Sequence, residues 1–167
     1  MYELDLTAPR RIHVVGVGGS GMSALALLLR EMGHDVSGSD LRDSRALDRL
    51  RVAGVHVAVG HDAANIPPDT DAVVISTAVP RTNLEVRVAE ERVIPVLRRA
   101  DALRALVRTR RTIAVAGSHG KTTTSSMLAV SLLAAGWEPS FLIGGEPHEV
   151  GTNASRGAGE WLVVEAD

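Results

Sequence analysis

Apolar and polar residues alternate in blocks along the chain, and the blocks predict strands that are each followed by a helix. The apolar run Arg11–Val15 is typical of a buried strand, and apolar residues recur at near-helical spacing between Met22 and Met32. Gly33 is expected to end that helix as a C-cap. A second strand is predicted over 36–39, and it ends in Asp40. The chain therefore opens with a predicted β-α-β unit.

The same alternation continues through the middle of the chain. The pattern predicts helix 44–53, strand 55–59, turn 65–69, strand 72–76, helix 84–91, strand 93–96 and helix 100–107. The strand at 72–76 is apolar throughout, as expected for a strand that is buried on both faces. His13, inside the first strand, is expected to fill packing space. Strands that alternate with helices predict an α/β fold around a parallel sheet.

A second strand–loop–helix pattern begins near Thr112. The apolar run 112–115 precedes a glycine loop, and 125–133 is predicted to be helical. We expect the basic run 108–111 to be a solvated linker rather than a nucleic-acid contact, which divides the chain into domains 1–107 and 108–167. The segment 160–164 is predicted to be a strand that Glu165 ends. We expect the second domain to be incomplete, because a P-loop domain needs more strands than this.

Composition excludes several classes of function. Of the 167 residues 45% are hydrophobic, enough for a core, and the net charge of −2 offers no bulk attraction to nucleic acid. Aromatic residues make up 2%, too few for base-stacking platforms, and there is no cysteine. The first ten residues do not resemble a signal peptide, and no apolar run approaches the roughly 20 residues of a membrane span. We therefore expect a cytoplasmic protein without nucleic-acid or membrane partners; a homo-oligomer stays open.

The first glycine loop predicts a site for a diphosphate. Residues Gly16–Gly21 fit G-x-G-x-x-G between a strand and a helix, and Asp40 follows nineteen residues after Gly21. Glycine N–H groups at a helix N-terminus favour a phosphate, and an acid at that spacing is typical of ribose binding. Taken alone this pattern indicates NAD. A glycine-rich turn without a ligand is the alternative.

The second glycine loop predicts a site for a nucleoside triphosphate. Gly117–Gly120 followed by Lys121 and Thr122 matches G-x-x-G-K-T. This is shorter than the usual P-loop, because Val115 stands where the longer motif has its first glycine. Lysine can neutralise phosphate charge, and a threonine hydroxyl can bind Mg²⁺. For Glu165 at the end of its strand, a magnesium ligand and an ordinary surface acid are both open.

In this order and spacing, the motifs resemble the N-terminal part of a Mur ligase, over nearly the whole chain from Arg11. The segments that carry the resemblance are Gly16–Ser23, Ser37–Asp40, Gly60–His61, Ser76–Val79, Gly117–Thr124, Gly151–Ala154, Gly157, Gly159 and Glu165–Asp167. The resemblance implies a Rossmann-like domain followed by the truncated start of the family's ATP-binding central domain.

The resemblance also changes the expected ligand of the first loop. In this family the N-terminal domain holds the UDP of UDP-N-acetylmuramic acid rather than NAD, by the same phosphate–helix physics. The implied substrate-binding residues are Gly18, Gly19, Ser20, Gly21, Met22, Asp40, His61, Ser76 and Thr77. For His61 and Ser76, hydrogen bonding within a local turn is the alternative.

For the second loop the resemblance implies ATP and Mg²⁺. The implied cofactor-binding residues are Gly117, Ser118, His119, Gly120, Lys121, Thr122 and Thr123. Lys121 and Glu165 are the implied catalytic residues, and Thr122 and Glu165 the implied metal ligands. The implied reaction converts the muramyl carboxylate to an acyl phosphate, which the amine of L-alanine attacks.

Three functions are open at this point. The first is the L-alanine-adding reaction of peptidoglycan precursor synthesis, and the second is a family member that adds a peptide to UDP-N-acetylmuramate in cell-wall recycling. The third is an NAD-binding redox or regulatory module. Since the central domain is expected to be incomplete and the amino-acid domain missing, we expect the 167-residue chain alone to be unable to ligate.

Overall fold

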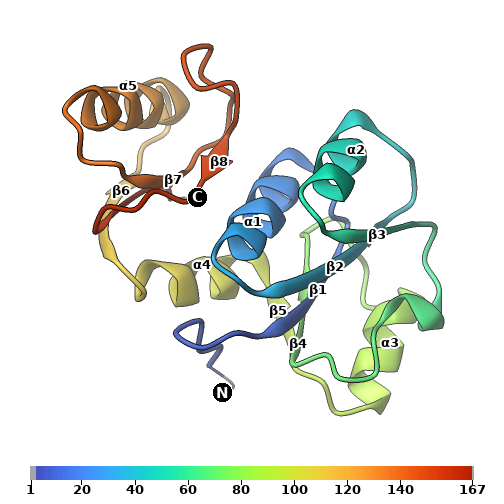
Figure 1. Cartoon of the computed structure of the whole chain (residues 1–167). Helices are drawn as coiled ribbons and strands as arrows, with labels where there is room; N and C mark the ends of the chain where they lie inside the picture. Colours follow the sequence, from blue (N-terminus) through green and yellow to red (C-terminus); the bar gives the residue numbers. More distant parts are fainter. Residues whose placement is uncertain (1–2, 167) are drawn as a thin grey trace. The chain divides into compact units, whose positions relative to one another are not determined.

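The computed structural model describes residues 3–166, which form two compact units that divide between Ala105 and Leu106. Figure 1 shows both units, and each is described by itself. The expected domain change at 107/108 lies close to this division and stays a prediction. Asp167, the last residue of the Glu165–Asp167 motif, lies outside the described residues. Within the described range no helix has the length and apolar character needed to cross a bilayer.

The first unit is a parallel five-stranded sheet in the order β3-β2-β1-β4-β5. Its elements are β1 (Arg11–Val15), α1 (Ser20–Glu31), β2 (Asp35–Asp40), α2 (Arg45–Val52), β3 (His56–Val59), the 3₁₀ turn η1 (Ala63–Asn65), β4 (Ala72–Ile75), α3 (Leu84–Glu91), β5 (Val96–Arg98) and α4 (Arg99–Val107). Helices α1 and α2 cover one face and α3 the other (Figure 1). The predicted α/β fold is confirmed.

The order of this sheet sets where a ligand can bind. The chain builds outward from β1 through β2 to β3, then returns to the other side of β1 with β4 and β5. The strand order therefore reverses between β1 and β4. In open α/β sheets the crevice at the carboxyl ends of the strands on either side of such a reversal is the usual ligand site. The first glycine loop, which follows β1, lies at this point.

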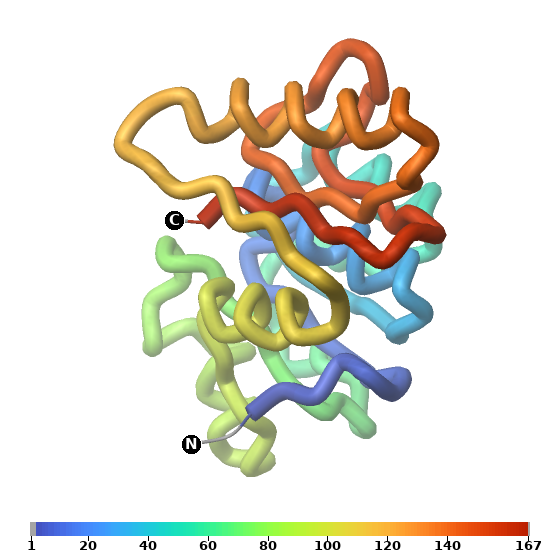
Figure 2. The backbone as a smooth tube through the Cα atoms, turned by 90° about the vertical axis from the view of Figure 1, so that its left-hand side faces the viewer, coloured from blue at the N-terminus to red at the C-terminus, as the bar shows by residue number. Residues whose placement is uncertain are grey.

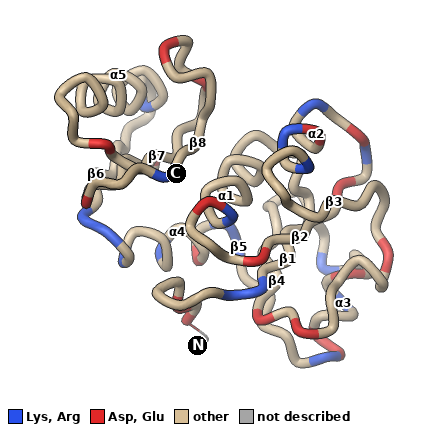
Figure 3. Tube along the Cα trace, viewed as in Figure 1, with Lys and Arg blue, Asp and Glu red and all other residues tan. Residues whose placement is uncertain are grey.

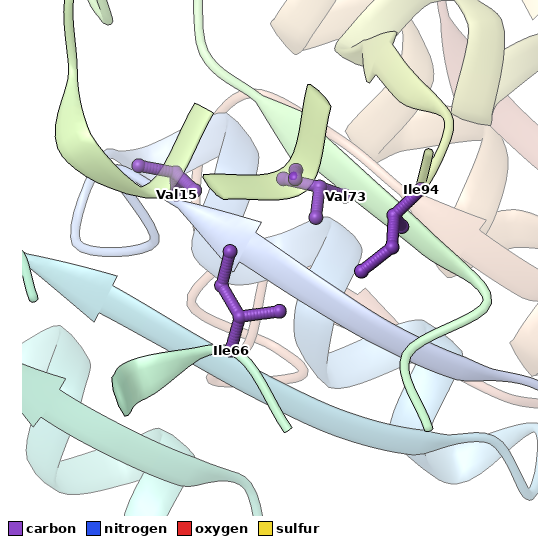
Figure 4. Packing of buried hydrophobic residues seen from close by; sticks show 5 residues of the cluster. Val15, Ile66, Val73 and Ile94 are labelled. Atoms are coloured by element: carbon purple, nitrogen blue, oxygen red, sulfur yellow. The ribbon is translucent and has the colours of Figure 1, made fainter. Parts of the chain in front are cut away.

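Apolar burial on both faces holds the central strands in place. On the α3 side Val15, Ile66, Val73 and Ile94 pack together with Ala89 (Figure 4). On the other side Leu25, Leu28 and Leu29 of α1 are fully buried, and each such side chain contributes about 1.5–3 kcal/mol when removed from water. The prediction that 72–76 is apolar because both faces are covered is confirmed for Ala72–Val74, each 0% exposed.

The strand predicted over 93–96 is wrong in its bounds. β5 begins only at Val96, because α3 ends in a left-handed turn that occupies the preceding residues. Val93 has a φ of 59°, and the N–H of Ile94 reaches back 2.8 Å to the carbonyl of Ala89. This hydrogen bond satisfies a carbonyl that the helix end leaves open, which is the Schellman pattern. A β-branched residue in this conformation gives no sequence signal for it.

The side chain of Val93 is 87% exposed, so burial of this side chain does not offset the energetic cost of its positive φ. We expect Val93→Gly to raise the free energy of unfolding of the first unit by about 1 kcal/mol, because glycine adopts positive φ without a Cβ clash. The matched control is Val52→Gly, at a residue 90% exposed at the end of α2, which should lower it by roughly 0.5 kcal/mol. Both tryptophans lie in the second unit, so urea unfolding should be followed by far-UV circular dichroism and amide exchange of β1. A change of the same sign in both variants would contradict the assignment of strain.

The second unit holds a four-stranded sheet in the order β6-β9-β7-β8, with only β8 antiparallel to its neighbour. Its elements are β6 (Arg111–Val115), α5 (Lys121–Ala134), β7 (Ser140–Leu142), β8 (Ala154–Ser155) and β9 (Trp161–Glu165). Helix α5 lies along one face of the sheet (Figures 1 and 2). β7 and β8 were not predicted, because three and two residues are too short for a periodic pattern.

The basic run at 108–111 is only partly the solvated linker that we expected. Arg111 is the first residue of β6, and its guanidinium lies 4.2 Å from the centre of the Trp161 ring. Arg110 donates a hydrogen bond to the carbonyl oxygen of Gly159. Figure 3 shows this basic segment between α4 and β6. These two cations therefore attach the start of β6 to the strand beside it.

Candidate functional site

The first glycine loop places the N-terminus of α1 at the end of the central strand. Gly16 turns with a φ of +79°, and the N–H groups of Gly16 and Val17 donate to the carbonyl of Ser39 at 2.8 and 3.0 Å. Gly19 is the N-cap of α1, and no side chain caps the helix there. The N–H groups of a first helical turn have no acceptor within the helix, so this end of α1 favours an anion.

Gly18 and Asp40, two of the predicted substrate residues, are hydrogen-bonded to each other. The N–H of Gly18 donates to Oδ2 of Asp40 at 2.8 Å, and a Cβ on Gly18 would lie 2.8 Å from the same oxygen. Oδ1 of Asp40 accepts the N–H of Arg42 at 3.2 Å. In this conformation the carboxylate braces the glycine loop. Their contacts with a diphosphate and a ribose stay predictions.

Met22 is positioned by the core rather than by a ligand. Its side chain is 3% exposed, and its N–H donates to the carbonyl of Gly19 at 3.0 Å. The contact of Met22 with a substrate, which the resemblance implies, stays a prediction, although its side chain is packed in the core in this conformation. The physical reason is the helical period, which turns Met22 onto the buried face of α1.

A cation that sequence analysis missed lies beside this loop. A Cβ built on Gly21 would lie 3.0 Å from Nε and 3.1 Å from Cζ of Arg99, the first residue of α4. The guanidinium is therefore packed against the first turn of α1, where a diphosphate is expected. A side chain at position 21 would therefore have to displace this guanidinium. The sequence signal was weak, since Arg99 follows a different strand and stands in an arginine pair.

Ser76 and Thr77 follow β4 at the same edge of the sheet. A Cβ on Gly16 would lie 3.0 Å from Oγ of Ser76, so the turn after β4 lies against the turn after β1. The N–H of Ser76 donates to the carbonyl of Val15 at 3.3 Å. A cavity of about 260 Å³ opens beyond β4 and β5, lined by Ser76, Thr77, Arg81, Arg98 and Asp101 among others.

His61, the remaining predicted substrate residue, belongs to a buried polar network around Glu85. Glu85 lies on α3, is 0% exposed, and accepts hydrogen bonds from Ser39 Oγ at 2.5 Å, Asn65 Nδ2 at 2.6 Å and the N–H of Asp62 at 3.2 Å. Nδ1 of His61 lies 3.3 Å from Oε2 of Glu85. The alternative for His61 was hydrogen bonding within a local turn. This accounts for only part of its contacts, because the ring also lies beside Glu85 of α3.

His13 also belongs to this network, so that its buried ring, which was expected to fill packing space, also has polar partners. Its side chain is 0% exposed, with Nδ1 2.8 Å from Oγ of Ser37 and Nε2 3.4 Å from Oε2 of Glu85. Sequence periodicity identified the strand but not the partner, because Glu85 lies 72 residues further along the chain.

The network keeps Glu85 ionised inside the protein. Burial alone would raise the pKa of its carboxyl. The hydrogen bonds from His13, Ser39 and Asn65, with the charge of His13, outweigh this and lower the pKa from 4.5 to about 2. The folded state therefore binds fewer protons at Glu85 than the unfolded state does between these two values.

This shift predicts an acid-sensitive first unit. As the pH falls from about 4.5 to about 2, Glu85 is protonated first in the unfolded chain, so the stability that its carboxylate contributes should be progressively lost. His13 and His61 both face this carboxylate. In Glu85→Gln this pH-dependent part should be missing, so the difference in stability between the wild type and the variant should shrink as the pH falls. Amide exchange of the β1 residues at several pH values measures it; a constant difference would contradict the prediction.

In the second unit the glycine loop turns from β6 into α5 as the motif predicted. Gly117 has a φ of +152° and Gly120, the N-cap of α5, a φ of +74°, both in the region that favours glycine. Nζ of Lys121 donates to the carbonyl of Gly117 at 2.8 Å, so the lysine lies over its own loop. Ser118, His119 and Thr123 are exposed. Their contacts with a nucleotide stay predictions.

The structure brings Thr122 and Glu165 together. Oγ1 of Thr122 lies 3.3 Å from Oε2 of Glu165, although 43 residues separate them in the sequence. Glu165 is 6% exposed, and Ser125, one turn after Thr122, donates to its other oxygen at 2.8 Å. Ser125 was missed because a serine inside a helix carries no motif; its spacing of three from Thr122 was the available signal.

Two glycines keep space open beside this pair. A Cβ on Gly144 would lie 2.6 Å from Oε2 of Glu165 and 3.2 Å from Oγ1 of Thr122, and a Cβ on Gly145 2.9 Å from Cγ2 of Thr122. The hydroxyl and the carboxylate thus face a space that any side chain at position 144 would fill. Hard oxygen donors in such a space suit Mg²⁺.

Two α/β units, one with a glycine loop at a switch point and one with a lysine–threonine loop facing an acid, define the class of protein. Residues 11–111 match the model of the Mur ligase family, catalytic domain. The match covers more than half of the chain, and the chain belongs to the Mur ligase family.

Relatives and solved structures in this family are ligases. The chain is 52% identical over 167 residues to UDP-N-acetylmuramate–L-alanine ligase of Saccharopolyspora erythraea, covering 98% of the chain and 34% of the relative. It is 55% identical over 160 residues to the enzyme of the same name from Acidovorax sp. strain JS42, covering 96% of this chain and 33% of the relative. The chain thus spans about a third of the length of these relatives.

Solved structures of two kinds of ligase share the fold. The UDP-N-acetylmuramate-alanine ligase of Thermotoga maritima matches with a TM-score of 0.85 at 32% identity, over 93% of this chain and 37% of that one. A murein peptide ligase from Psychrobacter arcticus matches with a TM-score of 0.86 at 32% identity, over 95% and 38%. The fold alone therefore does not separate the two kinds.

Proposed function

We propose that this chain is the UDP-sugar-binding part and the P-loop of a cytoplasmic, ATP-dependent ligase that joins L-alanine to UDP-N-acetylmuramic acid in peptidoglycan precursor synthesis. The observation that carries the proposal is the identity of 52–55% to relatives named for this reaction, over nearly the whole chain. This level of identity favours the alanine-adding reaction over peptide recycling, for which the structural likeness is equal.

The first unit would bind the UDP part of the substrate at the switch point after β1. The first turn of α1, which follows its N-cap Gly19, offers its N–H groups and the positive end of the helix dipole to the diphosphate. Arg99 beside Gly21 adds a full positive charge. Ser76 and Thr77 line the neighbouring cavity. The N–H groups of this turn and the guanidinium of Arg99 suit an anionic ligand.

The second unit would activate the carboxylate of the substrate. A carboxylate is a poor electrophile, so its oxygen first takes the γ-phosphoryl group of ATP; the amine of L-alanine then displaces phosphate from the acyl phosphate. Such a transfer depends on positioning and neutralisation of charge. Lys121 would leave the carbonyl of Gly117 and bind the β- and γ-phosphates, over the loop N–H groups of Gly117–Gly120.

Thr122 and Glu165 would hold Mg²⁺, which neutralises phosphate charge when bound. The donor pair fits the ion, because a hydroxyl and a buried carboxylate already face the space beside Gly144. The hydrogen bond from Ser125 orients the carboxylate of Glu165 and leaves Oε2 toward that space. Since the chain corresponds to about a third of its relatives, we propose that it does not ligate by itself.

The first test is calorimetric titration of the chain with UDP-N-acetylmuramic acid, with NAD in parallel. We expect heat of binding with the UDP sugar and none with NAD, because the relatives that carry the proposal are named for a reaction of UDP-N-acetylmuramate. Gly21→Leu should abolish binding, since the side chain would displace Arg99. The control Leu41→Ala, at an exposed residue, should bind as the wild type does. Binding of NAD alone would overturn the proposal in favour of a redox or regulatory module.

A second test concerns the metal at the P-loop. We expect Thr122→Ala to weaken binding of ATP in the presence of Mg²⁺ by about tenfold and to remove the difference between Mg²⁺ and a chelator, because one of the oxygen donors is lost. Fluorescence anisotropy of a labelled ATP analogue measures both. Thr124→Ala, two residues along the same helix, is the matched control. An unchanged response to Mg²⁺ in Thr122→Ala would exclude this metal site.

A further inference from the structure

Ser39 connects the glycine loop to the buried network. Its carbonyl accepts the N–H groups of Gly16 and Val17, while its hydroxyl lies 2.5 Å from Oε2 of Glu85 and 3.1 Å from Nδ1 of His61. One residue of β2 therefore positions the loop with its backbone and meets His61 with its side chain.

The protons of the network can be assigned by counting donors. An ionised carboxylate and a hydroxyl oxygen 2.5 Å apart need a hydrogen between them, and only Ser39 can supply it. The hydroxyl of Ser39 then has no proton left for His61. Nδ1 of His61 therefore faces two acceptors, Oγ of Ser39 at 3.1 Å and Oε2 of Glu85 at 3.3 Å. It must itself carry a proton.

When the ring is neutral, the opposite nitrogen is an acceptor. In a neutral imidazole with Nδ1 protonated, Nε2 holds a lone pair. The side chain of His61 is 14% exposed, and within the described part of the chain Nε2 has no hydrogen-bond partner. His61 follows β3, whose last residue Val59 pairs with Asp40 at the end of β2. His61 thus follows β3 at the carboxyl-end side of the sheet, where the nucleotide is expected.

We propose that Glu85 is a positioning residue that fixes His61 as the Nδ1–H tautomer, so that Nε2 accepts a hydrogen bond from the nucleoside of the bound UDP sugar. The inference rests on the proposed function for the ligand and goes beyond it in naming Glu85 and the direction of the hydrogen bond. The group recognised is a donor, either N3–H of uracil or a ribose hydroxyl. A base with an unprotonated nitrogen at this place would meet the lone pair of Nε2 and be rejected.

The tautomer is measured directly in the wild-type chain. Long-range ¹H–¹⁵N correlation of the imidazole nitrogens at neutral pH should show His61 with a protonated Nδ1 and an unprotonated Nε2, assigned by the loss of its signals in His61→Gln. This experiment needs no ligand. A protonated Nε2, whether Nδ1 is protonated or not, would overturn the proposal, whether or not the chain binds a UDP sugar.

Glu85→Gln tests whether Glu85 determines the tautomer of His61. Asp62 N–H and Asn65 Nδ2 both donate to Oε1 of Glu85, so the amide oxygen should take that place and the amide NH₂ should replace Oε2. The NH₂ group donates, and Nδ1 of His61 must then accept, which moves its proton to Nε2. We expect the two ¹⁵N shifts of His61 to exchange and the affinity for the UDP sugar to fall about tenfold, as for one lost hydrogen bond with a facing donor. Glu91→Gln, an exposed glutamate of the same helix, should change neither.

A merely structural role for Glu85 gives a different result. In that case Glu85→Gln lowers affinity while the tautomer of His61 stays the same, and the proposal fails. If the variant does not fold, the wild-type tautomer and the ligand series below still decide the question.

UDP analogues distinguish the two donors. Wild-type affinities for UDP, N3-methyl-UDP, 2′-deoxy-UDP and 3′-deoxy-UDP are compared by calorimetry. A loss confined to N3-methyl-UDP identifies uracil N3–H, and a loss with a deoxy analogue identifies the ribose. In either case the loss should vanish in His61→Gln, as a double-mutant cycle requires for a direct contact. Losses that persist in His61→Gln, or no loss with any analogue while UDP binds, would overturn the proposed contact. Failure of UDP and UDP-N-acetylmuramic acid to bind at all would instead overturn the proposed function.

Discussion

The hydrogen bonds that β2 makes at its carboxyl end are the constraint on which the first unit depends. The carbonyl of Ser39 holds Gly16 and Val17, and the carboxylate of Asp40 holds Gly18. A glycine loop has no side chains with which to fix its own shape, so its N–H groups are oriented by the strand beside it. The acid that resembles a ribose ligand in sequence is, in this conformation, part of what orders the loop.

The carboxylate of Glu85 shows how a buried charge can be kept inside an apolar unit. A lone carboxylate would be neutralised by burial, but this one accepts hydrogen bonds from a hydroxyl, a side-chain amide and a backbone N–H, with two imidazoles beside it. The donors come from β1, β2, η1 and its flanking turn. The network therefore joins α3 to β1, to β2 and to the segment around η1. Removing any one partner leaves the carboxylate of Glu85 with fewer hydrogen bonds.

The second unit uses the same physical device in a smaller form. Ser125 donates to one oxygen of Glu165, while the other faces Thr122 and the space beside Gly144. A carboxylate that is oriented before a ligand arrives loses little further freedom on binding. In both units, then, a buried acid from one element accepts hydrogen bonds from hydroxyl groups of other elements, and Glu85 accepts N–H groups as well.

Much of this could be predicted from local patterns. The β-α alternation, helix 84–91, the two glycine loops and the acid at the end of β9 all depend on neighbours in the sequence, and the fold class was predicted correctly from them. Val93 shows the limit of such patterns, because a valine with positive φ has no local signature. β7 and β8 show another limit, since strands of three and two residues form only through their partners.

Roles that depend on distant partners could not be predicted. The sequence by itself determined which residues carry the chemistry, namely glycines for the loops, Lys121 and Thr122 for phosphate and metal, and a set of polar residues at strand ends. Only the tertiary structure decided that Asp40 braces Gly18, that Arg99 lies against Gly21, and that Glu85 sits between two histidines. The reason is physical. A hydrogen bond or ion pair depends on distances of about 3 Å in space, and parallel strands bring together residues that lie tens of positions apart in the chain.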